Sequence, residues 1–124
     1  MITYFDSQPR FELTGEFNEG RALFKLLEDY TLYINNITVT VPAGFKTDFA
    51  SVPRFLWSIF PPSGEYAPAA IVHDYLYSSR ATVSRFLADA IFHEAMESAL
   101  KVPFWKRKSV YWAVRLFGGS HFKT

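Results

Sequence analysis

The chain has 124 residues, of which 49% are hydrophobic and 19% aromatic, a composition that excludes disorder and is sufficient for one domain with a single core. Its formal net charge of +1 predicts no strong electrostatic field, so we expect no nucleic-acid partner. The sequence contains no cysteine, which excludes disulfides and thiolate metal sites. We also expect no signal peptide and no transmembrane segment, because neither a basic N-terminal region nor a long apolar run is present.

We expect a single domain over residues 1–124, β-rich over residues 1–53 and helical over residues 54–124. The predicted fold class is α+β, with a small N-terminal antiparallel sheet packed on about three helices. The clearest β signal is a hairpin with a two-residue turn. Residues 30–34 are rich in aromatic and β-branched side chains, and residues 37–41 alternate between apolar and polar.

Two further features flank the hairpin. Upstream, Phe11 and Leu13 predict a short strand that Gly15 ends. Downstream, Asp48 lies in a polar loop between hydroxyl side chains that can bind backbone amides, which predicts an Asx-type turn leading into a short helix over residues 53–60. The aromatic residues of that helix are candidates for the wall of a pocket.

The first long helix, predicted over residues 68–78, is apolar nearly all round and should therefore be central. It carries His73 and Asp74, and Tyr77 lies four residues after His73 on the same face. A carboxylate on such a helix is unfavourable unless it is paired, hydrogen-bonded or bound to a metal. This pattern indicates a site, although the backbone or a nearby arginine would also satisfy these groups.

A second helix is predicted over residues 83–100, capped by Thr82 or Ser84. Asp89 lies in its middle among apolar residues, where a carboxylate needs a partner. If the two helices are antiparallel and joined by a short turn, Asp89 comes opposite His73.

A third helix is predicted over residues 103–117, ended by Gly118. Its aromatic and basic side chains are compatible with binding at a lipid or membrane surface. A core-packing helix with a solvated basic face is the simpler interpretation.

The residues of the first two helices suggest general-base chemistry. A neutral histidine can take a proton from water, and a carboxylate on its other ring nitrogen fixes the tautomer. His73 is the candidate base and Asp89 the candidate orienting carboxylate. The sequence contains no G-x-S-x-G motif and no cysteine, which disfavours covalent acyl transfer.

The remaining acids suggest a metal. Asp74 and Asp48, with carbonyl oxygens of the loop after Asp48, are candidates to hold a hard cation such as calcium, which would stabilise the oxyanion of an ester. Alternatively, His73 and His93 with Asp74 are candidate zinc ligands, although they do not form an H-E-x-x-H helix.

Four blocks in order, G-F-K-T-D-F-A-S-V-P-R, A-A-I-V-H-D-Y-L-Y, R-F-L-A-D-A-I-F-H-E-A-M and Y-W-A-V-R-L-F-G, resemble a phage and prophage family of small proteins of unassigned function. The match runs over residues 44–118. The resemblance implies a phage or prophage origin, and location in the bacterial host cytoplasm or in the virion. It implies no mechanism.

A narrower resemblance covers about 50 residues: His73-Asp74-x-x-Tyr77 is similar to the H-D-x-x-Y helix of secreted phospholipase A2. The segment around Asp89 resembles the partner helix of the prokaryotic branch. The resemblance implies an antiparallel helix pair with His73 as base, Asp89 as its orienting partner and Tyr77 as support. It also implies Asp74 as a calcium ligand and Asp48 or its loop as the rest of the calcium site. The chain departs from that family in having no disulfides, no glycine-rich calcium loop and a β-rich first third.

Three functions remain open on these grounds. The first is a metal-assisted ester hydrolase that uses His73 and Asp89, with lipid as a candidate ester. The second is a virion structural or accessory protein, such as a tail or head component, whose His–Asp pair is structural or vestigial. The third is a phage factor that binds a host protein. The aromatic surplus favours a partner interface, with phage structural proteins or self-association as candidates.

Overall fold

The computed structural model describes residues 3–5, 7–18, 20–48, 67–78 and 80–122. Its strands, in chain order, are β1 (Thr3–Phe5), β2 (Phe11–Asn18), β3 (Arg21–Leu26), β4 (Tyr30–Ile34), β5 (Ile37–Val41) and β6 (Lys46–Thr47). Its helices are α1 (Ala67–Tyr77), α2 (Arg85–Glu94), the π-helical η2 (Ala95–Ala99), α3 (Phe104–Phe117) and the 3₁₀-helical η3 (Gly118–His121). The α+β class is confirmed, and the short helix expected over residues 53–60 lies outside the described residues.

The strands form two antiparallel sheets of three strands each, where the sequence predicted one small sheet. The predicted hairpin is present with the expected bounds as β4 and β5, and Ile34 pairs with Ile37 across the turn. Asn35 turns the chain with a φ of 49°, a left-handed conformation that asparagine adopts more readily than most residues. β1 pairs with the other side of β4, so β5 is an edge strand of this sheet.

The second sheet corrects one expectation. β2 does not end at Gly15 but continues to Asn18, because Gly15 has a φ of 82° within a register shift between Leu13 and Phe17. Glycine adopts this conformation without steric cost, so the strand continues through a bulge instead of ending. β6 pairs with β3 and places Thr47 beside α1.

The three long helices predicted from the sequence are all present. α1 begins at Ala67 with Pro68 in its first turn, where a missing N–H group does no harm. α2 begins after Ser84, whose Oγ accepts a hydrogen bond from the Leu87 amide at 3.1 Å, so the second of the two predicted caps is the one used. The helix predicted over residues 83–100 corresponds to α2 followed directly by η2.

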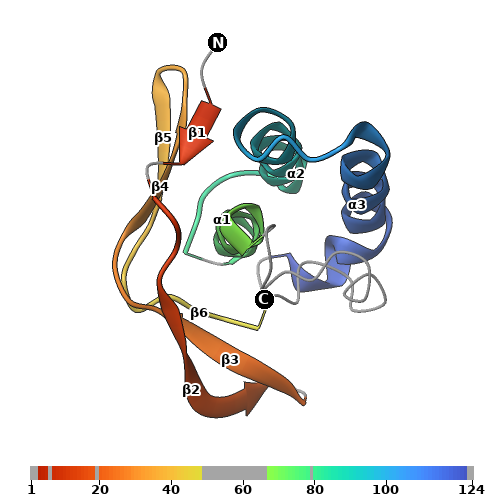
Figure 1. Ribbon diagram of the computed structural model, residues 1–124. Helices are drawn as coiled ribbons and strands as arrows, with labels where there is room; N and C mark the ends of the chain where they lie inside the picture. The colour runs from red at the N-terminus through yellow and green to blue at the C-terminus, as the bar shows by residue number, and fades with distance from the viewer. Residues whose placement is uncertain (1–2, 6, 19, 49–66, 79, 123–124) are drawn as a thin grey trace.

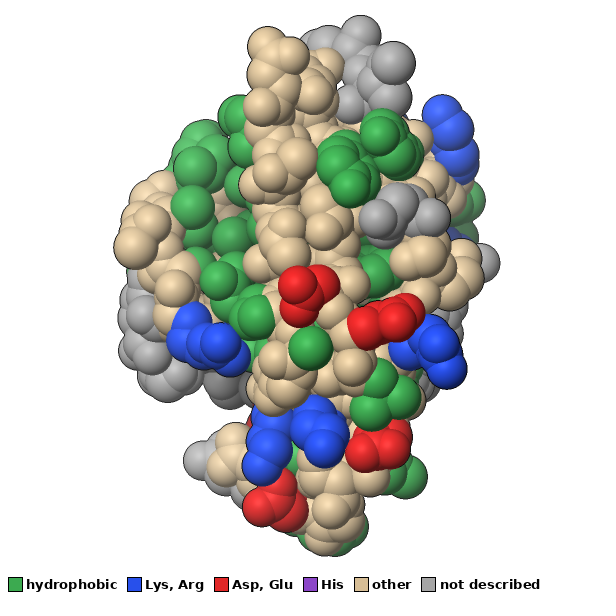
Figure 2. All heavy atoms as spheres, turned by 90° about the vertical axis from the view of Figure 1, so that its left-hand side faces the viewer, with side chains coloured by type: hydrophobic (Ala, Val, Ile, Leu, Met, Phe, Trp, Pro, Cys, Tyr) green, Lys and Arg blue, Asp and Glu red, His purple; other side chains and the backbone are tan. Residues whose placement is uncertain are grey.

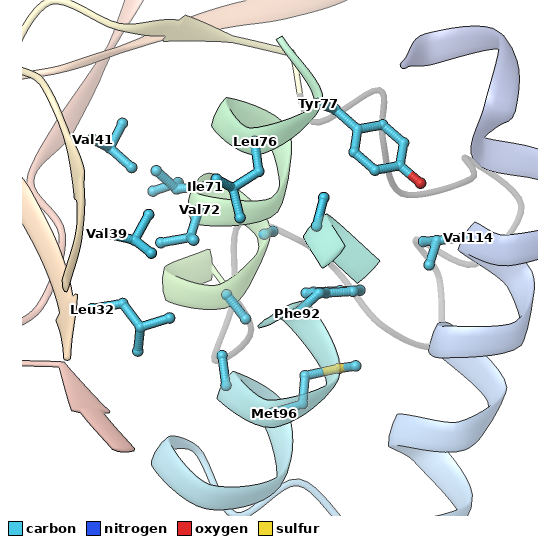
Figure 3. Close-up of a cluster of buried hydrophobic side chains, with 14 of the residues drawn as sticks. Leu32, Val39, Val41, Ile71, Val72, Leu76, Tyr77, Phe92, Met96 and Val114 are labelled. Carbon is cyan, nitrogen blue, oxygen red and sulfur yellow. The ribbon is translucent and has the colours of Figure 1, made fainter. Parts of the chain in front are cut away.

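The first helix forms the central layer of the molecule, between the first sheet and the other two helices (Figure 1). Nine of its 11 residues are buried, as its nearly all-apolar surface predicted. Apolar side chains of β4 and β5 face α1 from one side, and those of α2, η2 and α3 face it from the other (Figure 3). The buried residues of this core, those of α1 included, comprise Leu32, Val39, Val41, Ile71, Val72, Leu76, Phe92, Met96 and Val114. Within the described ranges, no helix has both the length and the apolar character needed to cross a bilayer.

Candidate active site

Three of the predicted site residues meet where α1 contacts α2. The Nε2 atom of His73 lies 2.7 Å from Oδ1 of Asp89, and the Tyr77 hydroxyl group donates a hydrogen bond to the same oxygen at 2.6 Å. His73 and Asp89 are 0% exposed and Tyr77 is 1% exposed. The predicted juxtaposition is therefore present, while the catalytic role of these residues stays a prediction.

The two helices that carry these residues are antiparallel. Tyr77, at the end of α1, accepts a hydrogen bond from Arg85 at the start of α2. His73, one turn earlier in α1, stacks on Phe92 near the end of α2 with ring centroids 4.4 Å apart. A residue later in α2 therefore contacts a residue earlier in α1, which is the order expected of an antiparallel pair. The four-residue spacing of His73 and Tyr77 directs both side chains toward α2, and Asp89 lies between them.

Two arginines complete this polar cluster. Arg115 of α3 donates from Nη1 to Oδ2 of Asp89 at 2.7 Å. Arg85 donates to the Tyr77 hydroxyl group at 3.2 Å and, from Nη2, to the carbonyl oxygen of Val114 at 2.7 Å. The sequence interpretation missed Arg115, which it assigned to a solvated face. The available signal was a single cation in the apolar last turns of that helix. The cluster links all three helices through one carboxylate.

The protonation states in the cluster follow from its contacts. Burial alone would raise the pKa of the Asp89 carboxyl group, but hydrogen bonds from His73, Tyr77 and Arg115 outweigh it and keep that pKa below its ordinary value of 3.8. Burial and the hydrogen bond to Asp89 raise the pKa of Tyr77 far above its ordinary value. At neutral pH the cluster therefore contains an ionised carboxylate, a neutral phenol and a guanidinium group beside the imidazole ring.

This arrangement fixes how the imidazole ring can act. An ionised carboxylate only accepts hydrogen bonds, so Nε2 of His73 carries the proton of the contact with Asp89. Any proton that the neutral imidazole takes up must then arrive at Nδ1. The carboxylate would also stabilise the imidazolium ion that results. The cluster therefore has the parts of a general base held by an orienting carboxylate.

The two acids predicted to bind calcium lie where β6 meets α1. Asp74 accepts a hydrogen bond from the Thr47 hydroxyl group. Asp48 is buried, accepts a hydrogen bond from the Asn18 amide at 3.1 Å and lies 3.9 Å from Nη1 of Arg21. Calcium requires oxygen lone pairs, but hydroxyl, amide and guanidinium donors contact these carboxylates. The loop carbonyl oxygens after Asp48 that would complete the predicted site lie outside the described residues, so the prediction of calcium stays untested.

The alternative zinc ligands do not come together. His93 packs edge-on against Tyr111 of α3 at 5.2 Å between ring centroids, and burial lowers the pKa of its imidazole ring. Its Nε2 atom is buried and has no hydrogen-bond partner within the described part of the chain. No group of three or more His, Cys, Asp or Glu side chains there could hold a metal ion.

The fold and the cluster define an α+β protein with a buried His–Asp pair between antiparallel helices. Residues 24–114 match a family described as a protein of unknown function, DUF1353, and the chain belongs to that family. It is also 33% identical over 109 residues to "Uncharacterized protein y4jT" of Sinorhizobium fredii (strain NBRC 101917 / NGR234), an alignment that covers 84% of this chain and 32% of the relative. The chain thus spans about a third of the length of that curated relative. No solved structure matches the chain at a significant level.

Proposed function

We propose that the protein is a phage- or prophage-encoded hydrolase of carboxylic esters, similar to phospholipase A2, with His73 as its general base. The observation that carries this proposal is the contact of 2.7 Å between His73 Nε2 and Asp89 Oδ1, reinforced by the Tyr77 hydroxyl group on the same oxygen. The H-D-x-x-Y resemblance implies the same three roles. The phage origin is supported by the four sequence blocks.

The reaction would be hydrolysis by an activated water molecule. Nδ1 of His73 takes a proton from water as the water oxygen forms a bond with the ester carbonyl carbon. Asp89 keeps the ring in the required tautomer and stabilises the imidazolium ion. The carbon–oxygen bond to the leaving alcohol then breaks, and the proton on Nδ1 passes to the leaving oxygen. The products are a carboxylic acid and an alcohol.

The outer face of α3 supports a lipid ester as the substrate. Trp105, Trp112 and Leu116 follow one another at helical spacing and are 61%, 57% and 71% exposed. Lys106 and Lys108 lie over aromatic rings of the same helix, within 6 Å of the ring centroids. Exposed tryptophan beside lysine is the composition that amphipathic helices use at a lipid–water interface.

The test is hydrolysis by purified protein of short- and long-chain p-nitrophenyl esters and of phosphatidylcholine and phosphatidylglycerol vesicles. His73→Gln should lower kcat by about 100-fold or more, because general-base catalysis contributes roughly 10²–10⁴-fold. His93→Gln is the matched control, the same substitution on the next helix, and should retain the wild-type rate. Circular dichroism checks that both variants fold. Absence of ester hydrolysis by wild type, or equal rates for wild type and His73→Gln, would overturn the proposal.

One observation favours a second candidate, a virion structural or accessory protein. His73 and Asp89 are fully buried, and Arg115 and Arg85 tie their cluster to α3, as expected for a polar element that specifies helix packing. In that case His73→Gln should lower the unfolding midpoint, and wild type should hydrolyse none of the esters. The exposed face of α3 would then contact other virion proteins.

A further inference from the structure

An apolar groove borders β5, which is the edge strand of the first sheet among the described residues. It has a volume of about 520 Å³ and runs between β5, the connection that follows α1, and α2. Most of its walls are apolar, including Ile37, Val39, Leu76, Val83, Leu87 and Ile91. Figure 2 looks onto the strands. In its upper half, hydrophobic side chains (green) gather in a hollow to the left of the central tan column, at the height where Figure 1 places the β4–β5 hairpin.

The strand register directs backbone groups outward at this edge. In a hairpin with a two-residue turn, the pair that closes the turn exchanges backbone hydrogen bonds, and hydrogen-bonded pairs then alternate. Ile34 and Ile37 close this turn, so Ile37, Val39 and Val41 bond to β4. The N–H and C=O groups of Thr38 and Thr40, which also line the groove, point away from β4. The two N–H groups and two C=O groups of Thr38 and Thr40 can therefore form backbone hydrogen bonds with another strand.

Edge strands commonly carry charged residues, proline or a bulge that prevents pairing with another chain. β5 has none of these: its five residues, Ile-Thr-Val-Thr-Val, pair with β4 without a register shift. Val39 and Val41 are buried whereas Thr38 and Thr40 are exposed, and the strand contains only strong β formers. Its edge is therefore suited to accept a further strand.

Opposite charges mark the two ends of the groove. Glu94 lies at the end near the hairpin turn, because its Oε2 atom accepts a hydrogen bond from Thr3, which pairs with Ile34. Arg80 lines the groove and precedes α2, at the other end of that helix. Its guanidinium group has no hydrogen bond or ion pair within the described part of the chain. Ten residues of α2 span about 15 Å, the length of four or five extended residues.

We propose that β5 binds an extended peptide segment of another protein by strand addition in this groove. The backbone of the peptide bonds to Thr38 and Thr40, alternate apolar side chains enter the groove, and a carboxylate of the peptide pairs with Arg80. Main-chain hydrogen bonds provide affinity in this mode of recognition and the side-chain pockets provide specificity. The site is separate from the His73–Asp89 pair and does not depend on the proposed hydrolase.

The probe is a pooled heptapeptide library with apolar residues at alternate positions and glutamate at one end or the other, which covers both strand directions. Peptides of the library should bind to wild type and to Thr38→Ala, which keeps the backbone N–H group of residue 38. They should not bind to Thr38→Pro, which lacks this N–H group. Proline at this position removes no bond to β4 and is tolerated on an edge strand. The best peptide should slow hydrogen exchange of the Thr38 and Thr40 amides specifically.

Charge reversal tests the carboxylate contact. Arg80→Glu should weaken binding of the selected peptide by about tenfold, which corresponds to the loss of about 1.4 kcal/mol. The same variant should bind more tightly a peptide with lysine in place of the glutamate. Arg10→Glu, an exposed arginine away from the groove, is the matched control and should bind like wild type. Failure to enrich any peptide, or equal enrichment on Thr38→Pro, would overturn the proposal. Protection of both amides in a dimer of the free protein would do so as well, because a second copy would then occupy the edge.

Discussion

Asp89 is the residue through which the helices are joined, because His73, Tyr77 and Arg115 all donate to its two carboxylate oxygens. Asp89→Asn preserves the shape of the side chain but leaves Arg115 without its counter-charge and turns an N–H donor toward other donors. We expect the free energy of unfolding at neutral pH to fall by about 3 kcal/mol, the usual loss when one partner of a buried pair is removed. Urea unfolding measures this loss, and Glu28→Gln, at an exposed acid, should change it little.

The same residue should give a pH-dependent stability. The pKa of folded Asp89 is lower than its ordinary value of 3.8, so its stabilisation is complete above the unfolded pKa and is lost as the pH falls through the lower folded pKa. The difference in unfolding free energy between wild type and Asp89→Asn should therefore shrink on acidification below 3.8. A difference that stays constant through that range would show that the charge of Asp89 does not stabilise the fold.

The sequence predicted one part of this cluster and missed the other for a physical reason. His73 and Tyr77 are four residues apart on one helix, and Asp89 follows after a short connection, so local helical geometry brings them together. Arg115 reaches Asp89 from a third helix, 26 residues along the chain. Its position depends on how α3 packs, which spacing alone does not determine. The same applies to Asn18 beside Asp48, a contact between residues 30 apart in the sequence.

The second helix carries Asp89, and its N-terminal cap is a testable part of its stability. Ser84 Oγ accepts the hydrogen bond of the Leu87 amide, which otherwise has no partner in the first turn. Ser84→Ala should lower the free energy of unfolding by about 1 kcal/mol. Ser84→Asp should retain it, since aspartate caps as well. Thr82→Ala removes the other cap suggested by the sequence and should have little effect, so equal losses for Ser84→Ala and Thr82→Ala would contradict this assignment.

The hairpin, which has a strong local signal, was predicted with the correct bounds, and the elements set by long-range pairing were not. The β4–β5 hairpin has alternation, β-branched residues and a turn pair within 12 residues. By contrast, β6 contains two residues and exists because it pairs with β3. Gly15 was interpreted as a strand end because glycine is compatible with both a turn and a bulge. Only the pairing of β2 with β3 distinguishes the two.

The first helix, α1, separates two different surfaces of the protein. Its His73 and Tyr77 side chains face the polar cluster with α2 and α3, whereas Tyr75 and Leu76 line the groove beside β5. The second helix is divided in the same way, with Asp89 in the cluster and Ile91 in the groove. Changes at sites that share no partner usually combine additively. The hydrolase and peptide-binding proposals can therefore be tested on the same protein by separate variants.

The response of the whole molecule to calcium tests the acids between β6 and α1. Because Asn18, Arg21 and Thr47 contact the carboxylates of Asp48 and Asp74, the unfolding midpoint should be the same in chelator and in millimolar calcium, with magnesium as the control ion. Asp48→Asn should lower the unfolding midpoint by the same amount in chelator and in calcium, because the variant loses the attraction between residue 48 and Arg21. A ligand that binds only the folded state adds about 2.7 kcal/mol at 100 times its Kd. A rise specific to calcium that disappears in Asp74→Asn would contradict this prediction and make calcium part of the hydrolytic site.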